Sequence, residues 1–284
     1  MKSDCHIHML LNGEDWRAAI DGHRTQPDRE LIRSRLRAYA DAGYTYLRDG
    51  GDRWGVGAAA REMAEEFGIT YRTPLSPLCK AGHYGGFIGK KFQNINDYKE
   101  LVKKTRRDGG DFIKIMISGL MDFDCFGHLT EDSLPPQEIA QLIRIAHEEG
   151  FAVMVHANGA RAVEAAAAAG ADSVEHCAYL DIQAMAAMRE NGTVWCPTLS
   201  AVGNLRGRGR FDESAVNAIY STAVENVAAF AKMGGLIAPG SDAGAWAVPH
   251  VQGGDDEYEH MRFALGDRCD EILARGIREI RRKF

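Results

Sequence analysis

Short apolar runs alternate with longer helical stretches along almost the whole 284-residue chain. The runs have the length of buried strands, which are expected over residues 3–8, 44–48, 70–75, 112–117, 152–156, 173–176, 193–197 and 236–240. Helices are expected over residues 27–42, 94–108, 135–149, 160–169, 182–190, 213–233 and 257–282. Such alternation is typical of βαβ units, which place their strands in a parallel sheet.

Proline and glycine mark the ends of several of these helical stretches. Pro27 stands near the first turn of one stretch, and Gly43 follows its end. Gly150 and Gly170 follow two other stretches in the same way. Proline suits a first helical turn and glycine suits the residue after a helix, so these positions support the expected boundaries.

Eight strands alternating with helices favour a (β/α)8 TIM barrel, with residues 1–284 forming one domain. Barrels of about 250 residues run as single domains, and a hydrophobic fraction of 45% is ordinary for a globular protein. The alternative is an open, doubly wound sheet. It rarely reaches eight regular units in this length, and no glycine-rich phosphate loop follows the first expected strand.

The overall charge and the cysteines restrict the class of protein. A formal net charge of −6 disfavours a nucleic-acid binder, which usually has a basic face. No run of about 18 apolar residues predicts a membrane span. The six cysteines form no C-x-x-C pair, so reduced thiols are the default. We therefore expect a cytoplasmic protein that acts on a small molecule, with no nucleic-acid or membrane partner.

Polar side chains interrupt two of the apolar strands. His6 and His8 share one face of the first strand, because side chains alternate across a strand, and two imidazoles on one face can bind a metal ion. Lys114 lies inside an otherwise apolar strand, where a cation is costly unless it is neutralised or paired. Taken singly, each residue also fits a structural role, such as a lysine paired with a nearby acid.

Three further polar residues stand where strands end. His156 and His176 close two strands, and Asp242 directly follows the last one. Each alone could be structural, since an aspartate after a strand is commonly a turn or helix-cap residue. Together with His6, His8 and Lys114, however, they all fall at the same end of the expected barrel, where barrel enzymes place their working residues. Imidazole and carboxylate ligands suit zinc, manganese, iron or nickel.

The sequence around these residues resembles the amidohydrolase superfamily, nearest to its imidazolonepropionase-like and Xaa-Pro-dipeptidase-like branch. The stretches that carry the likeness are TYLRDGG at 45–51, KIMISG at 114–119, VHANG at 155–159, VEHC at 174–177 and GSDAG at 240–244. Together with the His-x-His of the first strand, they follow the order of the superfamily at barrel spacing. Relatives usually add a small β-sandwich, which we expect to be absent here.

The resemblance implies a site for two divalent metal ions, with zinc favoured. The ligands of the first ion would be His6, His8 and Asp242. His156 and His176 would bind the second ion. Lys114, carboxylated on its amine, would bridge the two.

The activity that this resemblance implies is hydrolysis of an amide C–N bond, for example in a dipeptide or an N-acyl amino acid. A hydroxide shared by the metals would attack the carbonyl, with Asp242 as catalytic proton shuttle. A lactone or cyclic amide is an alternative substrate. A mononuclear deaminase is another alternative, although such members generally lack the bridging lysine. A non-catalytic metal-binding barrel is the third. Homo-oligomers are common in the superfamily.

Loops after the strands supply candidate substrate contacts. His83 and Tyr84, in a glycine-rich loop, match a Gly-His pair that lies near the substrate in the resembled branch; a plain surface loop is the alternative. Tyr179 could point into the same pocket. The arginines of residues 204–210 could bind a carboxylate, or that loop could simply be solvated. We expect residues 48 and 49, an arginine and an aspartate, to form a salt bridge that supports the site.

Overall fold

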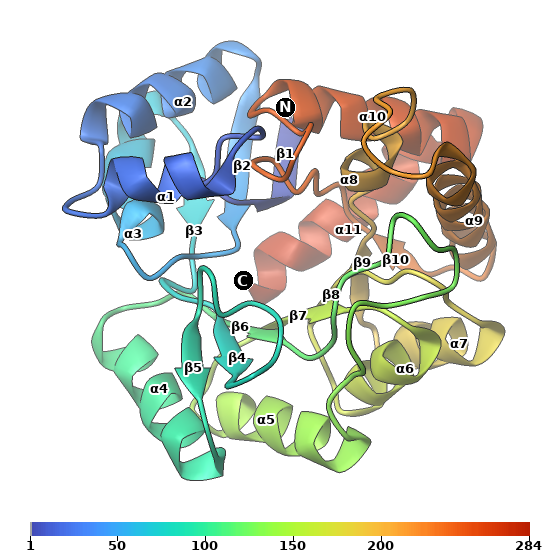
Figure 1. Cartoon of the computed structure of the whole chain (residues 1–284), viewed down its shortest axis with the longest axis horizontal. Coiled ribbons are helices and arrows are strands. Elements are labelled where there is room, and N and C mark those ends of the chain that lie inside the picture. The colour runs from blue at the N-terminus through green and yellow to red at the C-terminus, as the bar shows by residue number, and fades with distance from the viewer. Residues whose placement is uncertain (1) are drawn as a thin grey trace.

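The computed structural model describes residues 2–284, which form ten strands and eleven α-helices (Figure 1). The strands are β1 (Lys2–Ile7), β2 (Tyr44–Asp49), β3 (Thr70–Arg72), β4 (Leu78–Lys80), β5 (Lys90–Phe92), β6 (Ile113–Met116), β7 (Val153–Ala157), β8 (Ser173–His176), β9 (Val194–Cys196) and β10 (Leu236–Ile237). The helices are α1 (Trp16–His23), α2 (Arg29–Asp41), α3 (Val56–Ala64), α4 (Ile95–Arg107), α5 (Pro136–Glu148), α6 (Ala160–Ala168), α7 (Ile182–Glu190), α8 (Ser200–Gly203), α9 (Glu213–Lys232), α10 (Gln252–Leu265) and α11 (Cys269–Lys283). Two short 3-10 helices, η1 (Glu65–Phe67) and η2 (Gly266–Arg268), complete the set.

All paired strands run parallel, as the alternation of strands and helices predicts. They form a three-stranded sheet, β1-β2-β3, and a seven-stranded sheet, β10-β9-β8-β7-β6-β4-β5. A parallel bridge between Ile7 and Ala243 joins β1 to the segment after β10. Within residues 2–284 the strand ladder is thus interrupted between β3 and β4, so an α/β fold with parallel sheets is confirmed, and the closed eight-stranded barrel stays a prediction.

Most predicted elements are present within a few residues of their expected bounds, but some are not. The short strands β4 and β5 were not predicted, and neither were α1, α3 and α8. The single helix expected over residues 257–282 is wrong, because α10 and α11 are separate helices with η2 between them. Gly266 breaks the helix: its φ of +59° is a left-handed conformation that glycine adopts without steric cost.

Side-chain caps explain where several helices begin. Asp28, Asn94 and Asp212 each accept a hydrogen bond from a backbone N–H in the first turn of the helix that follows. Such caps satisfy N–H groups that have no partner within the helix. The polar residue directly before each of these three helices therefore fixes where the preceding loop ends.

Most helices lie around the outside of the strands, whereas α11 runs across the middle of the view behind them (Figure 1). Ile280 of α11 packs against Cys5 of β1 and Tyr46 of β2, and the ring of Phe284 lies 4.4 Å from the Arg48 guanidinium. The amino ends of the strands are thereby covered, which leaves the carboxyl ends for the site. No helix within the described residues is both long and apolar enough to cross a bilayer.

Candidate metal centre

The carboxyl ends of the parallel strands bring the predicted ligands together. His6 Nε2 lies 3.4 Å from His8 Nε2 and 3.6 Å from Asp242 Oδ1, and His8 Nε2 lies 3.4 Å from that same oxygen. His6 lies in β1, His8 directly follows β1, and Asp242 lies after β10; the Ile7–Ala243 bridge holds these two segments side by side. Three donor atoms from the two ends of the sequence therefore form one small triangle.

The edges of this triangle fit a divalent metal ion. Zinc ligands bind at about 2.0–2.2 Å in a tetrahedral arrangement, which separates neighbouring ligand atoms by about 3.3–3.6 Å. The observed separations of 3.4–3.6 Å fall in this range. In addition, the other ring nitrogen of His8, Nδ1, is buried without a hydrogen-bond partner. The spacing of the three donor atoms therefore suits a divalent metal ion.

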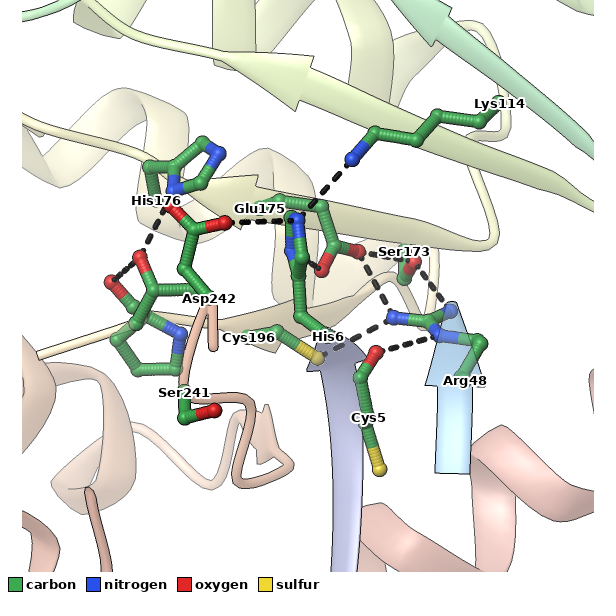
Figure 2. Close-up of polar contacts among 12 residues, drawn as sticks. Cys5, His6, Arg48, Lys114, Ser173, Glu175, His176, Cys196, Ser241 and Asp242 are labelled. Atoms are coloured by element: carbon green, nitrogen blue, oxygen red, sulfur yellow. Dashed lines mark hydrogen bonds and ion pairs between the residues drawn. The ribbon is translucent and has the colours of Figure 1, made fainter. Parts of the chain in front are cut away.

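Lys114 lies beside this triangle, with its Nζ 3.0 Å from His6 Nε2 (Figure 2). Its side chain is buried, and burial lowers the pKa of its amine to about 8. Close approach is possible because residue 50 is glycine: a Cβ there would lie 2.3 Å from His8 Cε1 and 2.8 Å from Lys114 Nζ. The lysine thus lies beside the candidate ligands and lines the same pocket.

His156 and His176 form the second part of the cluster. Their rings lie 4.6 Å apart, and the His176 ring lies 5.0 Å from that of His6. Thr198 donates its hydroxyl hydrogen to Pro197 O and so accepts one from His176 Nδ1, at 2.7 Å. The proton on Nδ1 leaves His176 Nε2 with a free lone pair. His156 Nε2 lies 3.3 Å from the Gly119 carbonyl, to which it can only donate, which leaves Nδ1 free.

Burial sets the charge state of the ligands. It is the largest cause lowering the pKa values of His6, His8, His156 and His176, and the Lys114 cation lowers each of them further. The imidazoles are therefore neutral at pH 7, as metal ligands must be. Burial also raises the pKa of Asp242 to about 7, against the opposing effect of Lys114. This carboxyl is poised to gain or lose a proton near neutral pH.

Two of the candidate ligands have unusual backbone conformations. His176 has a φ of +67° and Asp242 a φ of +61°, and Thr198 beside His176 has +52°. Residues with a side chain pay a steric cost in this left-handed region, and such residues cluster at functional sites. The side chains of His176, at the end of β8, and of Asp242, after β10, line the same pocket.

A buried charged network lies beside His6 (Figure 2). Glu175 Oε2 accepts from His6 Nδ1 at 2.7 Å, and Glu175 Oε1 accepts from Arg48 Nη2 at 2.9 Å and from Ser173 Oγ at 2.5 Å. The Arg48 and Glu175 side chains are both fully buried. By keeping the proton on Nδ1, the carboxylate directs the lone pair of His6 Nε2 toward the metal position.

The expected salt bridge between Arg48 and Asp49 is wrong. Adjacent residues of a strand point to opposite faces, so Arg48 turns inward to Glu175. Asp49 instead accepts hydrogen bonds from Met9 N and Thr73 Oγ1, both at 3.1 Å. The sequence interpretation also missed Glu175 as a site residue. Its signal was a charged residue within a buried strand, which is the same signal that identified Lys114.

Another buried carboxylate fixes the segment that carries Asp242. Asp4 Oδ2 accepts from Ser241 Oγ at 2.5 Å, and Asp4 Oδ1 accepts from Ser241 N at 2.9 Å. Asp4 and Ser241 are both buried. This contact attaches the residue before Asp242 to β1, so that His6, His8 and Asp242 keep their spacing.

A pocket of about 430 Å³ opens onto His8, Lys114, His156, His176 and Asp242. Tyr84 lines this pocket, and its ring lies 4.9 Å from that of His156. His83 does not line it, and its Nδ1 lies 3.6 Å from Glu131 Oε1. Tyr179 lines a small neighbouring cavity instead. The substrate-binding roles of all three residues stay predictions.

No protein-family model matches the sequence. The chain is 24% identical over 236 residues to an ochratoxinase from Aspergillus niger, a match that covers 70% of this chain and 47% of that protein. The chain thus spans about half the length of the curated relatives it matches.

Solved structures with the same fold include a Xaa-Pro dipeptidase with bound methionine in the active site. It has a TM-score of 0.78 and 22% identity, covering 98% of this chain and 74% of that one. The A. niger ochratoxinase gives 0.78 and 19%, covering 98% and 70%. A bottromycin amidohydrolase gives 0.65 and 16%, covering 98% and 66%. The resemblance to the amidohydrolase superfamily is therefore confirmed, because these neighbours in sequence and in structure fit that superfamily.

Proposed function

We propose that this chain is a metal-dependent hydrolase of an amide C–N bond in a small molecule. The observation that carries the proposal is the triangle of His6 Nε2, His8 Nε2 and Asp242 Oδ1, with edges of 3.4–3.6 Å, at the base of a pocket. The relatives named amidohydrolase, dipeptidase and ochratoxinase support this reaction class. We also propose that residues 1–284 form a single (β/α)8 barrel.

The proposed centre holds two divalent ions, with zinc favoured. His6, His8 and Asp242 would bind one ion, and His156 and His176 the other. The metals supply Lewis acidity, which polarises a carbonyl and lowers the pKa of water toward neutrality. Lys114 would bridge them as a carbamate. The lowered pKa of its amine, about 8, supports this role because carbamate formation needs the neutral amine.

Asp242 would move the proton in this reaction. Its carboxylate accepts a proton from the attacking water, whose oxygen bonds to the carbonyl carbon. The C–N bond then breaks, and Asp242 returns the proton to the leaving nitrogen, so that the products are a carboxylic acid and an amine. A carboxylate can do both steps, because one group can accept the proton from water and then return it to the leaving nitrogen.

The test combines metal content with turnover. The purified protein is assayed for bound metal by mass spectrometry and for hydrolysis of N-acyl amino acids, dipeptides and lactones, before and after chelation. About two metals per chain, with amide hydrolysis that chelation abolishes and zinc restores, is the expected result. Hydrolysis confined to lactones would indicate that the protein cleaves an ester C–O bond instead of an amide C–N bond. One metal with ammonia release indicates a deaminase, and metal without turnover indicates a non-catalytic protein.

The proton transfer is tested separately with Asp242→Asn. The amide keeps an oxygen that can bind metal but cannot take up a proton at neutral pH. We expect a loss of at least about 100-fold in kcat, within the range of 10²–10⁴-fold typical of general acid–base catalysis. Near-full activity of this variant with metal bound would refute the proton-shuttle role.

A further inference from the structure

The pocket above the candidate ligands is mainly apolar. Its volume of about 430 Å³ lies within the range of about 300–1,000 Å³ that is typical of small-molecule sites. Its aromatic lining residues are Trp16, Tyr84, Phe87, Phe123, Phe211 and Trp246. Such a lining favours a bulky, ring-containing substrate over a small polar one.

The aromatic side chains form two groups. In the first, Trp16 and Phe87 have ring centroids 5.4 Å apart, and Tyr84 continues from Phe87 at 5.9 Å toward the ring of His156. Trp16 is 40% exposed, which is high for a tryptophan, and it leaves apolar surface at the pocket. This first group thus leads from an exposed indole ring to a candidate metal ligand.

The second group carries a positive charge. Phe211 lies 5.2 Å from Phe123 and 6.2 Å from Trp246, as measured between ring centroids. The guanidinium of Arg210 lies over the Trp246 ring at 4.3 Å and near the Phe211 ring at 5.4 Å. A guanidinium stacked in this way keeps its edge free for a planar, two-point contact with a carboxylate.

Arg210 differs from the other arginines of its loop. Arg206 donates to Asn217 and stacks on Tyr220, and Arg208 donates to Asn204 O. Neither lines the pocket. Across residues 2–284, Arg210 has no acidic side chain within ion-pair distance, so the loop presents one uncompensated cation to the pocket.

We infer that the pocket accepts an amide with a bulky aromatic group and a free carboxylate, and that Arg210 binds the carboxylate. The inference rests on the proposed function, because it names what that site would hydrolyse. Glu14 is the other charged lining residue outside the candidate ligand set. The negative charge of Glu14 would repel a carboxylate, so we assign the carboxylate of the substrate to Arg210.

A binding experiment tests this inference without requiring turnover. N-dansyl-L-phenylalanine is aromatic and carries a carboxylate, but its sulfonamide is not an amide C–N bond. Its affinity for the metal-replete protein is compared, by fluorescence titration, with that of N-dansyl-L-phenylalaninamide, which lacks the charge. We expect the wild-type protein to bind the carboxylate form about tenfold more tightly or better, as a charge-assisted pair of hydrogen bonds would give.

Four variants locate the contacts. Arg210→Met should remove the preference for the carboxylate, whereas Arg208→Met, in the same loop but outside the pocket, should keep it. Trp16→Ala should weaken both probes by a similar factor, because its ring contributes apolar contact only. A preference that survives in Arg210→Met would overturn the carboxylate assignment, as would a loss of affinity caused by Glu14→Gln instead.

A third probe and the Trp16→Ala variant test the aromatic contacts of the pocket separately. If N-dansylglycine, without the phenyl ring, binds as tightly as N-dansyl-L-phenylalanine and Trp16→Ala binds like the wild type, the aromatic contacts are refuted. Probe binding with the expected pattern but without amide hydrolysis would refute the proposed function alone. Hydrolysis of N-acyl amino acids with no effect of Arg210→Met would refute this inference alone.

Discussion

Removal of the Arg48 guanidinium should strongly destabilise the protein. Arg48→Met leaves the Glu175 carboxylate fully buried without its counter-ion, although Ser173 Oγ and His6 Nδ1 still donate to it. Breaking a buried ion pair by removing one partner costs about 3–5 kcal/mol. Since two hydrogen bonds to the carboxylate persist, we expect the lower part of this range, about 3 kcal/mol.

The assay is equilibrium unfolding in urea of metal-free protein at pH 7, followed by circular dichroism. A matched control is Arg29→Met, which breaks an exposed ion pair with Glu62 and should cost less than about 1 kcal/mol. A second variant, Arg48→Met combined with Glu175→Gln, removes both charges. If an unpaired buried charge causes the loss, the double variant should be more stable than Arg48→Met alone.

Two results would refute this reasoning. One is a loss for Arg48→Met no larger than that of the Arg29 control. The other is a double variant whose loss equals or exceeds the sum of the losses of its two single variants. The first would mean that burying Glu175 without Arg48 costs little. The second would mean that the pair contributes through packing rather than through charge.

Gly50→Ala should reduce zinc affinity at least about tenfold while leaving the fold intact, because its Cβ would lie 2.3 Å from the ring of His8 and 2.8 Å from Lys114 Nζ. Competition with a chromogenic chelator measures this affinity, and wild-type affinity would contradict the close approach. Burial raises the pKa of Glu257 to about 8, so between about pH 4.5 and 8 the folded state holds a proton that the unfolded state releases. Stability from this group is therefore complete below that window and is lost as the pH rises through it. Glu257→Gln should then reduce the loss of stability between pH 5.5 and 8 by on the order of 2 kcal/mol, measured by urea unfolding at both pH values; identical pH dependence of the two proteins would argue against it.

The sequence predicts the parallel α/β architecture, and it makes the four histidines and Asp242 candidate ligands, because both follow from local patterns. Lys114 as a ligand rests on the family resemblance. Apolar runs of strand length carry the architecture, and a polar residue at the end of such a run is visible without tertiary information. His6, His8 and Asp242 meet in space because parallel strands share one end, which the order of elements already implies.

Other features depend on contacts that no local pattern encodes. The partner of Arg48 is Glu175, more than a hundred residues away, and only the sheet register brings them together. Short strands such as β4 and β5 lie in the stretch after β3 that reads as a glycine-rich loop. The single cation of the 204–210 loop that reaches the pocket could not be chosen among three arginines, because that choice depends on where Trp246 lies.

The bridge between Ile7 and Ala243 also has a consequence for how the chain folds. His6 and Asp242 stand far apart in the sequence, so their meeting closes a long loop, at a large entropic cost. Long-range contacts of this kind form slowly, after local βα units have assembled. A metal ion that needs both residues would bind only once this closure has occurred, so the rate of zinc uptake during refolding would report the last stage of folding.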